Sequence, residues 1–284
     1  MKGRQRMRLD SVKAGTLVAT LLIAVLAHTT DQAVLAGLLL LLGVPHGAAD
    51  HLLHNVTAGE RARGPGAFAR FYLVAMTVYT LLWAGAPSAA FAVFIELSVY
   101  HFGQTQPGSL TDQLIWGVFY LGFPVTYHYA EAAPIVAGML GHPLPDPGRW
   151  IEWVPWSLAL AALANAVYRR RFDLVTDLAV LSLMYVSTGL LLGFAVFFLF
   201  WHSLPSALAE YAFLRSRLRP AHWREFVRYL LPMSVAAAAF LWVAHAWLFV
   251  PGAPVLPLSR AFVLLSIITL PHAILVDRIY RPAA

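Results

Sequence analysis

The sequence contains no cysteine, and only 12% of its 284 residues are charged. The lack of cysteine excludes disulfide bonds, zinc-thiolate sites, thiolate-bound iron-sulfur clusters and a thiol nucleophile. The low charge, the 60% share of hydrophobic residues and the mean hydropathy of +0.67 exclude a soluble globular domain and predict a protein of the lipid bilayer. Histidine and carboxylate side chains remain as ligands for any metal chemistry.

Apolar runs long enough to cross the roughly 30 Å of bilayer hydrocarbon dominate the chain. We predict an all-α, polytopic integral membrane protein, a single membrane domain of residues 1–284 with about ten transmembrane helices. The expected spans are 14–30, 33–54, 67–86, 88–106, 112–129, 150–168, 172–187, 189–214, 225–248 and 259–280. The stretch 172–203 is too long for one crossing, so we divide it at the turn residues 187–189. The proline-rich connection 130–149 is expected to lie across the membrane surface or to fold back into the membrane.

Basic residues fall almost entirely on one side of this map. With the N-terminus inside, all of the 20 Lys and Arg residues except Arg149 and Arg260 lie on the cytoplasmic side. Cytoplasmic loops carry such an excess in membrane proteins. We therefore expect both termini to be cytoplasmic, with a basic N-terminal segment 1–13, in a multi-pass protein of the cell inner (plasma) membrane. Because the positive charge is confined between apolar spans, we expect no nucleic-acid partner.

Four of the expected spans carry a histidine at a shared depth. The residues are His46, His51 and His54 at the end of the first of these spans, and His101, His202 and His272 on the other three. Each of their spans runs from outside to inside and places its histidine in the cytoplasmic half of the bilayer. Ionisable side chains at membrane depth usually face the protein interior or a cavity, and neutral imidazole is a common metal ligand. The four together predict one metal site, whereas a single histidine would more simply donate an interhelical hydrogen bond.

Acidic residues could support such a site. Asp50 follows His46 by four residues and would share its face of a helix, so its carboxylate could orient that imidazole. Pairing of Asp50 with an arginine of residues 61–63 is the alternative. Glu96 lies in the middle of a span and is expected to be buried, either supporting a metal ligand or forming part of a proton path. Glu210 is expected to lie at the cytoplasmic boundary.

Four motifs lie in order on the histidine-bearing spans: Gly43-Val-Pro-His-Gly-Ala-Ala-Asp-His51, Ser98-Val-Tyr-His-Phe-Gly103, Phe200-Trp-His-Ser203 and Leu270-Pro-His272. Together they resemble the bacterial Brp/Blh family of beta-carotene 15,15′-dioxygenases over most of the chain. The PHGxxDH element is the most specific of them. The resemblance implies cleavage of beta-carotene by dioxygen into two retinals at a histidine-bound, non-haem Fe²⁺ in the membrane. It also suggests a retinal-binding opsin as the acceptor of the product.

Carried over to this chain, the resemblance implies a set of iron ligands: His46 or His51, His101, His202, and His272 either as a ligand or as its support. The chain departs from the family pattern at two places. Similar proteins carry a second histidine one turn after the WHS motif, where this chain has Ser206, and acidic residues after HFG, where it has residues 104–106 (Gln-Thr-Gln). Either His272 and the pair in the first motif complete the iron shell, or the chain is a divergent relative with altered chemistry.

Aromatic residues next to the motifs are expected to line a carotenoid channel: Tyr100, Phe102, Phe198 and Trp201. Beta-carotene and dioxygen both partition into the bilayer, so a cavity at membrane depth could receive both. Packing between helices is the alternative for individual rings. Two competing functions are a proton-coupled transporter, which also buries histidines and carboxylates, and a carotenoid- or retinal-binding relative without cleavage activity. A di-iron desaturase is disfavoured because the chain lacks HxxxH and HxxHH clusters.

Overall fold

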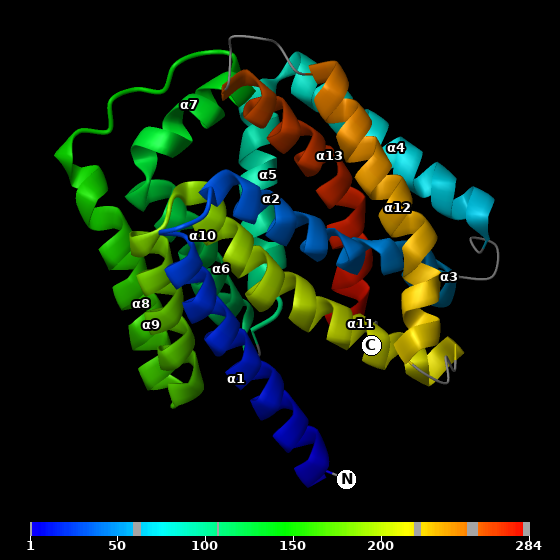
Figure 1. The fold of residues 1–284 in the computed structure, drawn as a ribbon. Helices are drawn as coiled ribbons and strands as arrows, with labels where there is room; N and C mark the ends of the chain where they lie inside the picture. The colour runs from blue at the N-terminus through cyan, green and yellow to red at the C-terminus, as the bar shows by residue number, and fades with distance from the viewer. Residues whose placement is uncertain (1, 59–63, 107, 219–222, 249–254, 281–284) are drawn as a thin grey trace.

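The computed structural model describes residues 2–58, 64–106, 108–218, 223–248 and 255–280, in which helices joined by turns and loops are the only regular secondary structure (Figure 1). The α-helices are α1 (Lys2–Leu26), α2 (Gln32–Gly43), α3 (Asp50–Thr57), α4 (Pro65–Gly85), α5 (Pro87–Gly103), α6 (Leu110–Tyr127), α7 (Tyr129–Leu140), α8 (Val154–Tyr168), α9 (Phe172–Ser187), α10 (Leu190–Phe197), α11 (Leu204–Leu218), α12 (Trp223–Leu248) and α13 (Val255–Tyr280). Two 3₁₀-helices, η1 (Val44–Ala49) and η3 (Arg149–Trp153), and one π-helix, η4 (Phe198–Ser203), join them. The predicted all-α class is confirmed.

Four helical segments of the described chain are long and apolar enough to cross a membrane: Gln32–Thr57, Pro65–Gly85, Leu190–Arg217 and Pro257–Tyr280. They coincide with four of the expected spans. The division of the stretch 172–203 is confirmed, because α9 ends at Ser187 and α10 begins at Leu190. The connection after α6 is largely helical, since it contains α7, which packs against α13.

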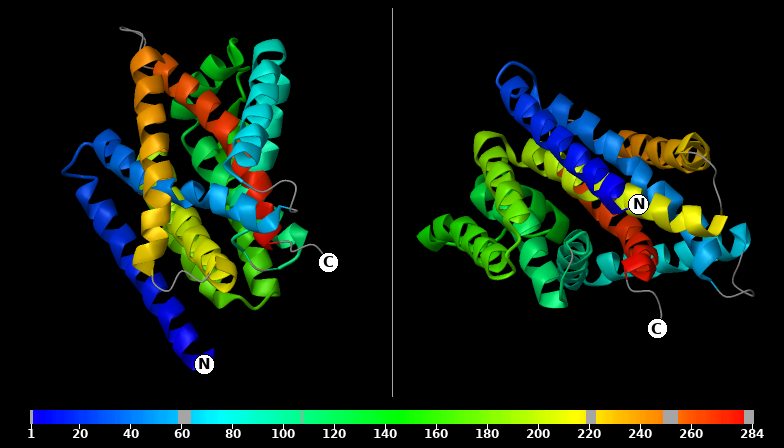
Figure 2. Two further views of the ribbon diagram at one scale, coloured as in Figure 1. Left: turned by 90° about the vertical axis from the view of Figure 1, so that its right-hand side faces the viewer. Right: turned by 90° about the horizontal axis from the view of Figure 1, so that it is seen from below.

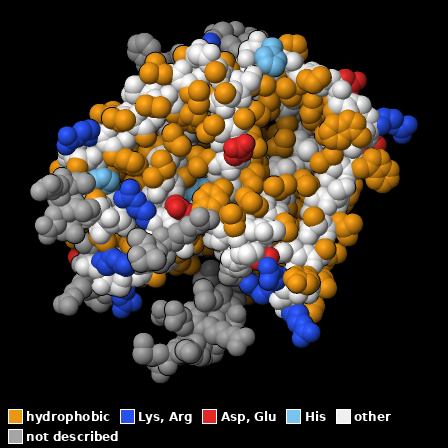
Figure 3. All heavy atoms as spheres, turned by 180° about the vertical axis from the view of Figure 1, so that it is seen from behind, with side chains coloured by type: hydrophobic (Ala, Val, Ile, Leu, Met, Phe, Trp, Pro, Cys, Tyr) orange, Lys and Arg blue, Asp and Glu red, His pale blue; other side chains and the backbone are white. Residues whose placement is uncertain are grey.

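The surface agrees with an apolar surrounding. Large hydrophobic side chains stand exposed on several helices, such as Leu73 and Leu81 on α4 and Leu160 on α8. Figure 3 shows hydrophobic side chains over much of one face, with most of its Lys and Arg side chains towards the lower part. Exposed apolar surface of this extent is unusual in a soluble monomer. The apolar helices therefore indicate a membrane protein.

The helices form two neighbouring groups (Figures 1 and 2). In one group α6, α8 and α9 pack against one another, and in the other α13 contacts α4, α5, α7 and α12. The aromatic core of the first group includes Trp116, Phe119, Tyr120 and Phe123, all with no exposed surface. Helix α10 contacts both α6 and α9 of the first group, and it also packs along α2. The segments η1 and η4 continue from α2 and α10 and contact each other.

A capping box fixes the start of α6 and joins it to α8. The Ser109 hydroxyl accepts a hydrogen bond from the backbone N–H of Asp112, whose carboxylate accepts one from the backbone N–H of Ser109 at 2.7 Å. The other oxygen of Asp112 accepts hydrogen bonds from Asn165 at 2.7 Å and from Arg169 at 2.9 Å, both from α8 or its end. This carboxylate therefore satisfies the first turn of one helix and anchors the last turn of another.

Two glycines allow α5 and α6 to touch through their backbones. A Cβ atom at Gly103 would lie 2.0 Å from the carbonyl oxygen of Gln113, and one at Gly117 would lie 1.9 Å from that of Val99. Small residues permit such close approach of helices within membranes. The contact holds the C-terminal turn of α5, which carries His101, at a fixed distance from α6.

We expect Gly117→Ala to destabilise the protein, because the added methyl group requires α5 and α6 to separate. Overpacking of this kind costs roughly 1–3 kcal/mol. The measurement is the thermal unfolding midpoint of the detergent-solubilised protein. Gly37→Ala on α2 is the matched control, since its Cβ atom would meet nothing within 4 Å. Equal midpoints for the two variants would contradict the close packing of α5 on α6.

Candidate metal centre

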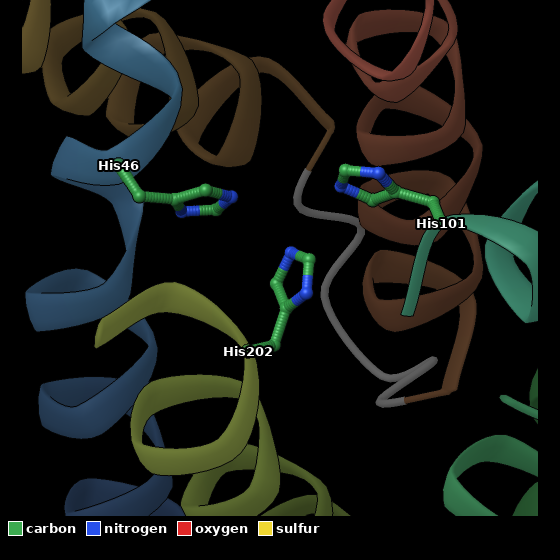
Figure 4. A group of neighbouring side chains, drawn as sticks. All are labelled: His46, His101 and His202. Atoms are coloured by element: carbon green, nitrogen blue, oxygen red, sulfur yellow. The ribbon is translucent and has the colours of Figure 1, made fainter. Parts of the chain in front are cut away.

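Three buried histidines from three separate elements point toward one another (Figure 4). They are His46 on η1, His101 on α5 and His202 on η4. One ring nitrogen of each lies within 4.8 Å of those of the other two. The side chains are 7%, 2% and 1% exposed. The structure thus brings together three of the histidines that the sequence motifs select.

A fourth histidine, His272 on α13, completes this group, which we call the histidine cluster. Its ring centroid lies 4.9 Å from that of His46 and 5.0 Å from that of His101. His51, the alternative to His46, does not join the cluster. Its Nδ1 is 2.9 Å from the carbonyl oxygen of Ala48. Between the two histidines of the first motif, the geometry therefore selects His46.

Irregular helical turns present two of these histidines. His46 lies in the 3₁₀ turn η1, which has Pro45 in its first turn, and His202 lies in the π-helical turn η4. Proline disrupts a continuous α-helix, and π-turns occur frequently at functional sites. The glycine at the end of α2 brings the two segments together, because a Cβ atom at Gly43 would lie 2.5 Å from the Phe198 ring and 3.0 Å from the Ser203 hydroxyl.

Three of the imidazoles use their Nδ1 atom as a hydrogen-bond donor on the outer side of the cluster. His46 Nδ1 donates to the carbonyl oxygen of Gly43 at 2.7 Å, and His101 Nδ1 donates to Oε1 of Gln104 at 3.1 Å. His272 Nδ1 donates to Oδ1 of Asp50 at 2.9 Å. Because each partner atom is an acceptor, Nδ1 carries the proton and Nε2 of a neutral ring keeps its lone pair.

The inner nitrogens have no partner. Nε2 of His46, His101 and His272, and Nδ1 of His202, are buried and have no hydrogen bond within the described chain. Leaving a buried polar atom unpaired costs roughly 1–3 kcal/mol, so four such atoms within one cluster require an explanation. A metal ion held by imidazole nitrogens supplies one, and iron, copper, zinc and nickel all accept such ligands. The residues therefore fit a bound metal.

Asp50 and Gln104, which accept hydrogen bonds from the imidazoles, form further hydrogen bonds with other polar side chains. Tyr72 on α4 donates its hydroxyl hydrogen to Asp50, and Tyr100 donates to Asp277. Gln104 also donates to Asp277, at 2.9 Å, so this glutamine links an aspartate on α13 to His101 on α5. Gln104 follows His101 by three residues, a helical spacing that would have identified it from sequence. No comparable signal identifies Tyr72 or Asp277.

The structure gives Asp50 a different histidine partner from the predicted one. Asp50 is buried and orients an imidazole, but that imidazole belongs to His272 and not to His46. A spacing of four residues shares a face only in an α-helix. Most of the interval from His46 to Asp50 is 3₁₀-helical, with about three residues per turn, and this rotates the two side chains apart. The alternative partners at 61–63 lie outside the described residues.

The prediction that Glu96 is buried is wrong. Glu96 is exposed on α5. It precedes His101 by five residues, or about 140° around an α-helix, so it faces away from the cluster. Glu210, which was expected at the cytoplasmic boundary, is 1% exposed.

An apolar cavity of about 380 Å³ leads to the histidine cluster. Its lining extends to Phe91 on α5, Leu190 on α10 and Phe262 on α13, ten to twelve residues before the histidine of each segment. At 1.5 Å per helical residue, these positions lie roughly 15–18 Å from the histidines. Nearly all the polar side chains of the lining gather at the histidine end. The cavity can therefore hold an extended apolar molecule with one part beside the cluster.

Two of the four aromatic residues expected in a substrate channel line this cavity. The ring centroid of Phe102 lies 4.8 Å from that of His202, and that of Phe198 lies 5.6 Å from that of His46. Trp201 packs into the hydrophobic core, and Tyr100 turns its hydroxyl to Asp277, so neither is part of the lining.

Comparison with known proteins agrees with this arrangement. The family model described as beta-carotene 15,15′-dioxygenase matches residues 37–280, a range that contains the whole histidine cluster. The chain belongs to this family. A beta-carotene 15,15′-dioxygenase from an uncultured marine bacterium (66A03) is 22% identical, with 86% of this chain and 92% of the relative aligned. A probable beta-carotene 15,15′-dioxygenase, Blh, of Halobacterium salinarum is 28% identical, with 88% and 85% aligned. No solved structure gives a significant match.

We expect Co²⁺ to bind the purified protein and raise its thermal unfolding midpoint. A ligand at about 100 times its dissociation constant contributes about 2.7 kcal/mol to the free energy of unfolding. His101→Ala should lose this stabilisation, because it removes one of the converging nitrogens. His142→Ala, which changes an exposed histidine, is the matched control. Equal stabilisation of the His101→Ala variant would remove His101 from the metal site.

Proposed function

We propose that this protein cleaves beta-carotene with dioxygen at its central 15,15′ double bond and releases two molecules of retinal. Membership of the family over residues 37–280 supports the class of reaction. The observation that carries the proposal is the apolar cavity that ends at four buried imidazoles with unpaired nitrogens. A hydrocarbon substrate requires apolar walls, and the attack of dioxygen on an alkene requires a metal centre rather than a nucleophilic side chain.

The histidine cluster would hold a non-haem Fe²⁺ ion through His46, His101, His202 and His272. Bound iron would supply the binding and activation of dioxygen. The net reaction breaks one carbon-carbon double bond and places one oxygen atom on each carbon, so the site needs no proton donor and no external reductant. The protein's own contribution is to orient the imidazoles, through Asp50 and Gln104, and to keep water out.

The cavity would hold the polyene in register with the cluster. Phe102 and Phe198 lie against the histidine rings and offer flat apolar surfaces to a conjugated chain. The arm that extends towards Phe91 and Phe262 would accept one end of the substrate. The distance from the cluster to the far end of this arm then selects which double bond is cleaved.

The reaction would take place inside the cell inner membrane. Four apolar helices of spanning length, the exposed apolar surface and the one-sided distribution of basic residues support this location. We propose about ten crossings with both termini cytoplasmic, which places the cluster in the cytoplasmic half of the bilayer. Beta-carotene and dioxygen would then reach the cavity from the lipid.

The direct test is expression in a bacterial host that accumulates beta-carotene, with chromatography of retinal and other apocarotenals. We expect retinal from the wild-type protein and from His142→Ala, and only background from His202→Ala, because the last variant loses a nitrogen of the cluster. Another apocarotenal from the wild type would contradict the central position of cleavage. If the inserted protein gave no product with iron supplied, carotenoid binding without cleavage would replace the proposed activity.

Blocking the arm should separate substrate binding from metal binding. Leu265 lines the cavity on α13, seven residues before His272, so Leu265→Trp would close the arm at about 10 Å from the cluster. We expect retinal formation to fall roughly tenfold or more while the affinity for Co²⁺ stays unchanged. Ile274→Trp adds the same bulk at an exposed position of the same helix and is the control. Full activity of Leu265→Trp would remove this arm from the substrate path.

A further inference from the structure

A buried carboxylate lies beyond the histidine cluster on the same helical surface. Glu210 on α11 is 1% exposed, and neither of its carboxylate oxygens has a hydrogen-bond partner within the described residues. Among the described residues, the ion pairs do not include Glu210. A buried acid without a donor or a countercharge is costly, and the proposed reaction does not use it as an acid or a base.

The helix directs Glu210 towards the cluster. Ser206 and Glu210 lie four residues apart on α11, which begins directly after the π-turn that carries His202, and all three residues are buried. Residues at this spacing share a helical face, and helical side chains tilt towards the N-terminus of the helix. The carboxylate of Glu210 therefore extends from its Cα atom back along α11 towards His202.

Neighbouring elements bring a second carboxylate to the same place. Helix α11 packs against η1 and α3, which carry His46 and Asp50. Glu210 on α11 and Asp50 at the start of α3 are both buried, and their two helices are in direct contact. Two buried carboxylates on adjoining helices repel each other unless a positive charge lies nearby.

The charges of the site balance only when both carboxylates are counted. Four neutral imidazoles bring no charge, so a divalent metal ion in the cluster carries two positive charges into an apolar interior. Asp50, which accepts the proton of His272 Nδ1 in a hydrogen bond, provides one negative charge. We propose that Glu210 provides the second and thereby acts as a positioning residue that makes the cluster selective for a divalent cation. This assignment rests on the proposed metal centre.

The affinity for Co²⁺ tests the assignment. Metal-free protein in detergent is titrated with Co²⁺ against a competing chelator, and binding is followed by the visible absorption of the bound ion. We expect Glu210→Gln to lower the affinity about 10- to 100-fold, as loss of outer partners of metal ligands does. Glu96→Gln, which removes an exposed carboxylate on α5, should bind like the wild type. Equal affinities of Glu210→Gln and the wild type would overturn the role of Glu210 but would leave the proposed metal centre standing.

A second variant distinguishes charge from packing. Ser206→Asp in the Glu210→Gln background returns a carboxylate to the same helical face, one turn nearer to His202. We expect it to restore most of the lost affinity, and a failure to do so would overturn the role of charge. If Glu210→Gln does not accumulate, the affinity of the Ser206→Asp/Glu210→Gln variant for Co²⁺ is compared directly with that of the wild type. A much weaker affinity of this double variant would overturn the role of charge. Absence of Co²⁺ binding in the wild type would overturn the proposed metal centre and the assignment together.

Discussion

Four imidazole rings buried against one another are the constraint on which the rest of the structure depends. Four of their ring nitrogens are buried without partners within the described residues, a state that would be costly in an apolar interior without a metal ion. The outer hydrogen bonds of His46, His101 and His272 fix which nitrogen keeps its lone pair. A change in any of these acceptors would release a ring from its orientation. The site is therefore defined as much by Asp50 and Gln104 as by the histidines.

Convergence of four helical segments on one point requires departures from regular packing. The 3₁₀ turn η1 and the π-turn η4 each re-aim a histidine that a continuous α-helix would direct elsewhere. Glycine provides the close approach, at Gly43 between α2 and η4 and at Gly103 and Gly117 between α5 and α6. Both irregular turns overlap the histidine-bearing motifs, and Gly43 and Gly103 lie within them, where they control the distance between helices.

The polar and apolar residues of the cavity lie at opposite ends of it. Its far walls are hydrocarbon and its polar groups lie at the histidine end, so an extended apolar molecule would meet the metal at only one point along its length. Such a site achieves selectivity through depth and shape, since a hydrocarbon offers no hydrogen bonds to recognise. Asp50 lines the cavity at its histidine end, and Glu210 is not part of the lining. The proposed substrate channel and the proposed metal centre can therefore share one interior.

The sequence by itself determined the helical class, the break between α9 and α10, and the four spans that carry the histidines of the cluster, because hydropathy sets both the position of a helix and the depth of a residue within it. The tertiary structure decided which faces meet. It paired Asp50 with His272 and not with His46, excluded His51, exposed Glu96 and buried Glu210. It also placed Phe102 and Phe198, but not Trp201, beside the cavity. The physical reason is that a single irregular turn rotates every later side chain about the helix axis. Neither the hydropathy nor the spacing of the residues reveals that rotation.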